Sequence, residues 1–132
     1  MKQKHFIACL ILVALSYVNA INVQADVRNE KKINIQHVPH GGQHNEFYIL
    51  ADQPDVYYNS GSQVIIIDGG GEVSYYDVEI ESMTTWLVVI STQVSGTYDT
   101  IDVSSLSSGD YIITITSPTG HEFEGYFEIE KQ

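Results

Sequence analysis

The chain has 132 residues, a length that suits a single folding domain, and a formal net charge of −11 at pH 7. Neither lysine nor arginine occurs between Lys32 and Lys131. Because nucleic acids and anionic lipid surfaces are bound by clustered basic side chains, we expect neither class of partner.

The N-terminal segment, residues 1–25, has the pattern of a secretory signal peptide. A basic start is followed by an apolar run at 6–18 that is too short to span a membrane comfortably, and small residues then occupy cleavage-type positions. We expect cleavage after Ala25, with Ala20 as the alternative site, and no membrane insertion of the processed chain. The protein would then be exported, to the periplasm or to the cell exterior. The single cysteine, Cys9, lies in this leader, so we expect a domain without disulfides.

The segment that follows, residues 26–45, is expected to be loose, and the folded domain is assigned to residues 46–132. Residues 26–32 are polar and typical of a chain terminus. Within the segment, the alternation of Ile33 and Ile35 in "KINIQHV" predicts a short strand.

Short stretches rich in valine, isoleucine, threonine and tyrosine fill the rest of the chain, with glycine, proline and serine between them. The clearest is 122–130, where Phe123, Phe127 and Ile129 share one face and glutamates occupy the other. Alternation with period two predicts antiparallel strands with one solvated face, and no stretch has a sustained helical period. About seven such strands predict an all-β protein, an antiparallel β-sandwich.

The uncharged stretch "TWLVVISTQV" is predicted to be one of these strands. It places Trp86, Val88 and Ile90 on one face.

The segment before the penultimate predicted strand carries a leucine, a glycine and a tyrosine: Leu106, Gly109 and Tyr111. In immunoglobulin-like sandwiches a tyrosine at this place follows the crossover between the sheets, and its hydroxyl bonds the backbone a few residues upstream. We expect Tyr111 to have this role, Leu106 to fill the crossover and Gly109 to allow its bend. The alternative is an ordinary strand tyrosine with a solvated hydroxyl.

The order of motifs in this part of the chain resembles a known family. Leu106, Gly109 and Tyr111 precede an alternating strand, a turn at Pro118–Gly120 and a closing "G-x-F-x-I" strand at 125–129. This pattern resembles the domain of unknown function 3244 family, small secreted immunoglobulin-like proteins of Gram-negative gut anaerobes. It is also similar to the C-terminal sorting domains of secretion systems.

The resemblance implies an immunoglobulin-like β-sandwich with a tyrosine-corner-type crossover, and an exported protein. It carries over no catalytic residue. Two features depart from these patterns. The chain has "MTTW" at 83–86, where the family has a glycine-led turn, and it ends without the basic tail of a sorting domain.

Three histidines, His37, His40 and His44, are close enough in sequence to be candidate metal ligands. Their spacing matches no standard zinc motif, and proline and glycines make the segment a loop, so we expect a polar connector and no metal or other cofactor. The sequence has no G-x-S-x-G motif, and its one cysteine lies in the leader. We therefore expect a protein that is not an enzyme.

Four tyrosines, Tyr57, Tyr58, Tyr75 and Tyr98, are candidate surface aromatics that could stack on sugar rings or anchor a protein partner. These residues and the elimination of other classes predict a non-catalytic accessory, protein-interaction or adhesion module. A carbohydrate-binding module and a secretion sorting domain are the alternatives. The partner, protein or glycan, and the oligomeric state stay open.

Overall fold

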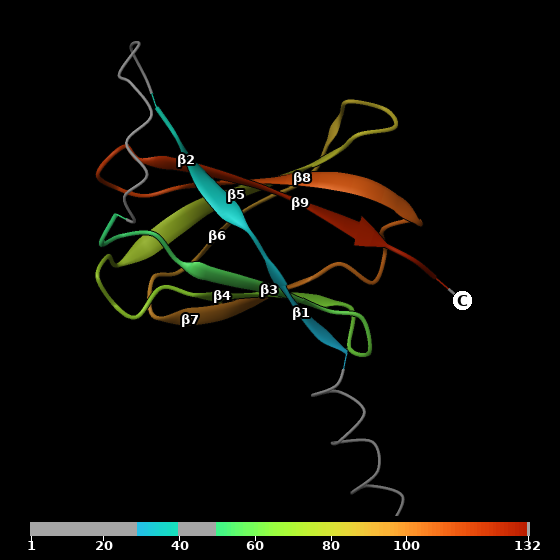
Figure 1. Cartoon of the computed structure of the whole chain (residues 1–132), viewed down its shortest axis with the longest axis horizontal. Coiled ribbons are helices and arrows are strands. Elements are labelled where there is room, and N and C mark those ends of the chain that lie inside the picture. The colour runs from blue at the N-terminus through green and yellow to red at the C-terminus, as the bar shows by residue number, and fades with distance from the viewer. Residues whose placement is uncertain (1–28, 40–49, 132) are drawn as a thin grey trace, which may run out of the picture.

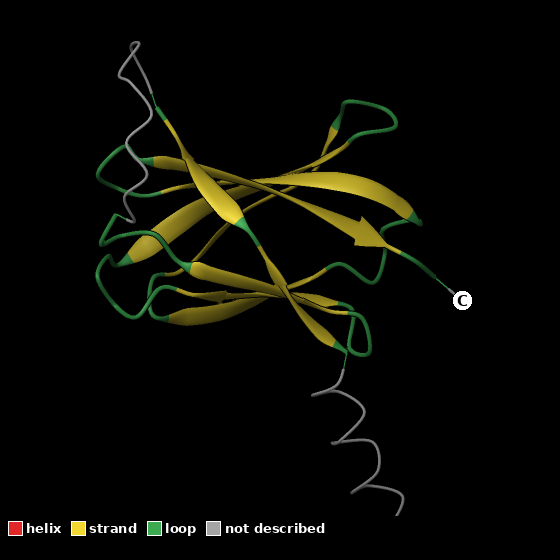
Figure 2. Cartoon of the chain, in the orientation of Figure 1, coloured by secondary structure: helices red, strands yellow, loops and turns green. Residues whose placement is uncertain are grey.

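Residues 29–39 and 50–131 are described by the computed structural model, and their regular elements are all β-strands (Figure 1, Figure 2). No helix in this part of the chain is long and apolar enough to cross a membrane. In chain order the strands are β1 (Glu30–Ile33), β2 (Ile35–Val38), β3 (Asp55–Asn59), β4 (Val64–Asp68), β5 (Tyr75–Ser82), β6 (Val88–Ser95), β7 (Tyr98–Asp102), β8 (Gly109–Thr116) and β9 (Glu122–Ile129).

These strands form two antiparallel sheets that lie face to face (Figure 1). The four-stranded sheet has the order β1-β3-β4-β7, and the five-stranded sheet has the order β2-β9-β8-β5-β6. The expected antiparallel sandwich is confirmed. The described residues hold nine strands where the sequence predicts about seven.

One reason for the difference is that the N-terminal strand divides between the sheets. Ile33 at the end of β1 pairs with Val56 in the four-stranded sheet, and Ile35 at the start of β2 pairs with Gly125 in the five-stranded sheet. Asn34 is the crossing residue between them. The domain therefore includes residues 30–38, so the assignment of the whole of 26–45 to a loose segment is wrong. Apolar contacts explain this, since Ile33 is buried and Ile35 packs against the core.

Gly125 makes room for the crossing. A Cβ at this position would lie 2.8 Å from Ile35 Cγ2 and 2.9 Å from Ile33 Cγ2. Such distances are shorter than normal carbon–carbon contacts, so a side chain here would push the crossing strand away from β9.

Replacing Gly125 with alanine should therefore destabilise the sandwich by about 1–3 kcal/mol, the usual cost of overpacking. Urea denaturation measures this as a lower unfolding midpoint. Glu124→Ala, next to it but on the solvent side of β9, is the control and should have little effect. An unchanged midpoint for Gly125→Ala would contradict the tight crossing.

The core lies between the sheets and consists mainly of valine and isoleucine with a few aromatic rings. Tyr76 and Phe123 are among its largest fully buried side chains. Near the crossover between β7 and β8, the rings of Tyr111 and Phe127 stack with centroids 5.6 Å apart, and Tyr58 packs against Phe127 from the other sheet at 5.8 Å. Burial of these apolar surfaces is the main stabilising contribution in a protein of this kind.

The crossover from β7 to β8 has the geometry of a tyrosine corner. Tyr111 is buried, and its hydroxyl donates a hydrogen bond of 2.6 Å to the carbonyl oxygen of Ser107. Leu106 is buried beneath the crossover. Gly109 has a φ of 154°, which residues with a side chain rarely adopt.

Tyr111→Phe should lower the free energy of unfolding by about 1 kcal/mol, because the carbonyl of Ser107 loses a buried donor. Differential scanning calorimetry would record a lower melting temperature. Tyr126→Phe is a matched control, because that hydroxyl bonds Glu124 at the exposed surface. Equal melting temperatures for wild type and Tyr111→Phe would contradict a stabilising role.

The turn between β5 and β6 differs from the prediction. The strand begins at Val88, and Trp86 lies in the turn with a φ of 59° and its side chain 63% exposed. Ser82 explains the change: its carbonyl accepts from Trp86 N at 2.8 Å, its amide donates to Leu87 O at 3.0 Å, and its Oγ accepts from the amides of Thr84 and Thr85. These bonds close a turn where alternation alone predicts an extended chain, and Trp86 occupies a left-handed position that favours glycine.

Candidate functional site

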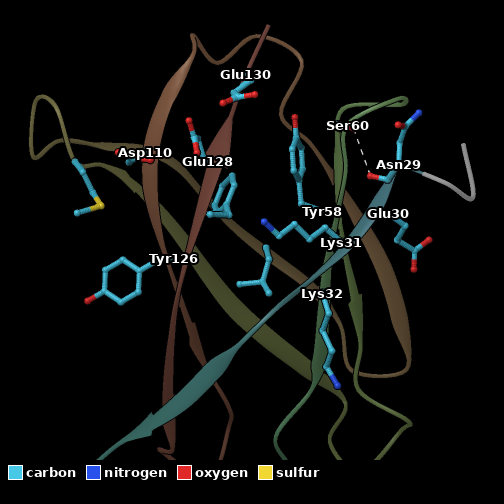
Figure 3. A pocket seen from close by; sticks show the side chains of 13 residues that line it. Asn29, Glu30, Lys31, Lys32, Tyr58, Ser60, Asp110, Tyr126, Glu128 and Glu130 are labelled. Carbon is cyan, nitrogen blue, oxygen red and sulfur yellow. Dashed lines mark hydrogen bonds between the residues drawn. The ribbon is translucent and has the colours of Figure 1, made fainter.

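A groove opens between β1 and the second half of β9 (Figure 3). Its volume is about 860 Å³. Ile33, Tyr58 and Phe127 are lining residues that are themselves buried, so they form an apolar floor. We call this hollow the β1–β9 groove.

The groove lies between two open sheet edges. β1 is the outer strand of the four-stranded sheet. Pairing between β2 and β9 ends at Ile35 and Gly125, so within residues 29–39 and 50–131 no strand pairs with the outer edge of Tyr126–Ile129. Backbone donors and acceptors on such edges are free to pair with an added strand.

Opposite charges face each other across the groove. Figure 3 shows Lys31 reaching from β1 towards β9, whereas Lys32 points away and pairs with Asp55 at 3.2 Å. The β9 wall carries the carboxyl groups of Glu128 and Glu130, which are alternate residues at the end of the strand.

The interaction with the Glu130 carboxyl group raises the pKa of Glu128, and the negative charge of Asp110 raises it further, while Lys31 lowers it. The wall therefore has more negative charge than Lys31 balances. A cationic group of a ligand would be stabilised there.

Tyr126 stands at the side of the groove with 59% of its surface exposed, and its hydroxyl donates to Glu124 at 2.7 Å. Tyr126 is not among the aromatic residues predicted from the sequence to bind a ligand. The alternation of β9 would have identified it, since a strand that turns Phe127 inwards turns its neighbour Tyr126 outwards.

A second polar constellation lies where β3 and β9 begin. Asp52 Oδ2 accepts hydrogen bonds from Ser117 Oγ at 2.6 Å, Thr119 Oγ1 at 2.7 Å and His121 Nδ1 at 2.7 Å. The Tyr76 hydroxyl donates to the carbonyl of Asp52 at 2.7 Å. We call Asp52, Ser117, Thr119 and His121 the Asp52 cluster. Sequence reasoning missed it, because Asp52 lies 65 residues before Ser117 and nothing in the local pattern connects the two.

Hydrogen bonds keep the Asp52 carboxylate ionised. Burial raises the pKa of Asp52, but the bonds from Ser117, Thr119 and His121 outweigh it and lower the pKa from 3.8 to about 2. An Asp–His pair can orient a histidine as a catalytic base. Here the hydroxyl of Ser117 donates its hydrogen bond to Asp52 and not to His121. The hydroxyl of Thr119 lies 3.1 Å from His121 Nδ1, the same nitrogen that bonds Asp52. The nucleophile–base bond of a catalytic triad is thus not made, and the arrangement ties a loop to the β8–β9 turn.

Of the candidate metal ligands, His37 lies on β2, and His40 and His44 lie outside the described residues. The His37 ring meets the His121 ring edge to face with centroids 5.5 Å apart, and lies 5.9 Å from the ring of Phe123. In the described ranges, no group of three histidine, cysteine or acidic residues is arranged to hold a metal ion.

The candidate surface tyrosines divide between core and surface. Tyr58 is only 7% exposed and packs on Phe127, so its assignment to the surface is wrong; it shares the inner face of β3 with Val56. Tyr57 and Tyr98 lie on the outer face of the four-stranded sheet, where Ile66 of β4 separates their strands. Tyr75 belongs to the other sheet.

Comparison with solved structures identifies the fold. The chain is similar to the crystal structure of a DUF3244 family protein with an immunoglobulin-like β-sandwich fold from Bacteroides vulgatus, with a TM-score of 0.60. This chain therefore has the immunoglobulin-like fold. The match covers 76% of this chain and 99% of that chain at 15% sequence identity, so the likeness is one of fold. No family profile matches the sequence, and no curated protein matches it.

Asp52→Asn should destabilise this immunoglobulin-like domain by about 2 kcal/mol at neutral pH, from the size of the pKa shift. Because the pKa of Asp52 is lower in the folded chain, the carboxylate contributes its full stability above about pH 4 and loses it as the pH falls to about 2. Thermal melts from pH 7 to pH 2 should show the gap between wild type and Asp52→Asn narrowing over that interval. Glu79→Gln, an exposed site on β5, is the control, and a gap independent of pH for Asp52→Asn would contradict the assignment.

Proposed function

We propose that this protein is an exported, non-catalytic interaction module, of the accessory or adhesion type, that binds an extended polypeptide segment along the β1–β9 groove. One observation carries the proposal: open edges of both sheets flank an apolar floor at the same place. The signal-peptide pattern of residues 1–25 supports export to the periplasm or the cell exterior.

Strand addition is the binding mode that this groove supports best. An extended segment beside Tyr126–Ile129 can exchange main-chain hydrogen bonds with the free edge. Every second side chain of that segment then points to the same side, where Tyr58 and Phe127 offer an apolar surface. The volume of about 860 Å³ is in the range of pockets that bind ligands.

Charge selects among such segments. Glu128 and Glu130 favour a lysine or arginine side chain, because a cation between them offsets the repulsion of their negative charges. Lys31 faces this wall and limits the excess of negative charge. The expected partner is therefore a polypeptide that alternates apolar and cationic residues.

Carbohydrate binding is the second candidate. Tyr57 and Tyr98 share an outer sheet face, an arrangement that could stack on a sugar. Neither ring contacts another aromatic ring among the described residues, so the two do not form a continuous aromatic platform. We therefore favour peptide binding in the β1–β9 groove over sugar binding on this face. A sorting-domain role rests on the resemblance of the C-terminal strands alone.

The test is an NMR titration of the processed protein with a decapeptide of alternating lysine and valine. The amides of Tyr126–Glu130 should shift, and the double variant Glu128→Gln/Glu130→Gln should weaken binding roughly tenfold or more, as expected for loss of two charge contacts. Glu79→Gln/Glu81→Gln has the same spacing on β5 of the same sheet and should leave the affinity unchanged.

Two outcomes would contradict the proposal. Binding that is equally weakened by both double variants would mean non-specific attraction to an acidic protein. Alternatively, an oligosaccharide found on a glycan array could bind, with loss of binding in Tyr57→Ala or Tyr98→Ala, while the decapeptide does not; this would establish the carbohydrate-binding alternative.

A further inference from the structure

Four consecutive apolar residues are exposed at the turn and the start of β6. Trp86 is 63% exposed, Leu87 65%, Val88 50% and Val89 41%. In Figure 1 the turn between β5 and β6 projects beyond the two layers, which explains why neighbouring residues on both faces are exposed. We call Trp86–Val89 the β6 patch. An exposed apolar patch of this kind marks an interaction site or an aggregation hazard.

The backbone of the same segment is also open. β6 is the last strand of the five-stranded sheet and pairs only with β5, so its outer edge is unpaired in the described residues. Natural edge strands are protected by charged side chains, proline, β-bulges or very short length. β6 has eight residues and contains no proline and no charged residue, and its pairing with β5 shifts register near Val88, where Glu81 pairs with Val88 and Ile80 with Ile90.

The turn that presents the patch is held in place. Trp86 keeps a left-handed backbone, φ 59°, because Ser82 bonds the amides of the turn. A bulky residue in this conformation is strained, and such strain is retained at sites where the geometry has a use. Here it fixes an exposed tryptophan, a residue type enriched among interface anchors.

Charge decides which partner fits the patch. Residues 82–98 contain no aspartate, glutamate, lysine or arginine, the longest such run in the described chain, whereas the protein carries a net charge of −11. A two-fold interface places the same surface of two copies together, so an acidic surface would repel its own copy. Asp99 binds the Ser95 amide at the far end of β6, so the turn and the start of the strand are the part of this edge on which two copies approach with the least repulsion.

We propose that the start of β6 is a self-association edge, at which two copies of this chain pair Val88–Ile90 with Val88–Ile90 in antiparallel fashion. Each copy then supplies Trp86 and Leu87 to a shared apolar contact, and the two five-stranded sheets become continuous. The interface uses the outer edge of β6, whereas the β1–β9 groove lies beside β9; Met83 of the β5–β6 turn lines the groove but is not part of the β6 patch.

The test is sedimentation equilibrium of the processed protein from micromolar to millimolar concentration. Wild type should approach twice the monomer mass as the concentration rises. Val89→Lys should raise the dissociation constant roughly tenfold or more, because two lysines would meet in the paired state. Gln36→Lys is the matched control: it adds the same charge at an exposed position on β2, the opposite edge of the same sheet, and should leave the dissociation constant unchanged.

A second variant separates association from folding. Trp86→Gly removes the anchor and relieves the left-handed strain, so we expect it to be monomeric and to melt a few degrees higher than the wild-type monomer. Hydrogen exchange at β6 amides should slow with concentration in wild type and not in this variant. The Glu128→Gln/Glu130→Gln variant should still associate, which distinguishes this proposal from the proposed function.

Several results would overturn the proposal. One is a wild-type protein that stays monomeric at every concentration. Another is association that survives both Val89→Lys and Trp86→Gly, or that Gln36→Lys abolishes. A monomer whose Trp86 fluorescence changes only on addition of the lysine–valine decapeptide or of phospholipid vesicles would assign the patch to a different partner.

Discussion

The passage of the N-terminal strand from one sheet to the other at Asn34 determines which surfaces of this protein are open. Ile33 completes the edge of the four-stranded sheet, and Ile35 starts the edge of the five-stranded sheet over Gly125. Because β2 begins only after the crossing, it covers only the first half of β9. The edge of Tyr126–Ile129 is left beside β1, and the groove is the space between them. Gly125 thus contributes to the candidate binding site indirectly, because it allows the N-terminal strand to cross close to β9.

Features that depend on neighbours in sequence were accessible from the amino acids alone. Alternation in β5 and β9 gives the correct inner faces, and the hydroxyl of Tyr111 reaches Ser107, only four residues upstream. The hydroxyl of Tyr76 makes a similar bond, but its acceptor is Asp52, 24 residues away across an unrelated loop. Nothing in the local pattern marks the second bond, although both hold a loop against the sandwich.

The predictions from sequence are wrong where two different backbone arrangements fit the same pattern of apolar residues. Ile33 and Ile35 turn inwards whether the strand stays in one sheet or crosses between two, so alternation cannot locate the crossing. Trp86 fits the period of a strand, but the backbone bonds to Ser82 favour a turn. The groove depends on which edges lie side by side, and this follows from the strand order, which the linear pattern does not contain.

The distribution of lysine also affects how this protein reacts with amine-directed reagents. The three lysines of the described chain are Lys31 and Lys32 on β1 and Lys131 just after β9. Two of them line the groove, and the long stretch between Lys32 and Lys131 offers no ε-amine. Among the described residues, a cross-linker or a support that captures ε-amines would therefore attach at β1 or at Lys131, and would leave β6 pointing into solution.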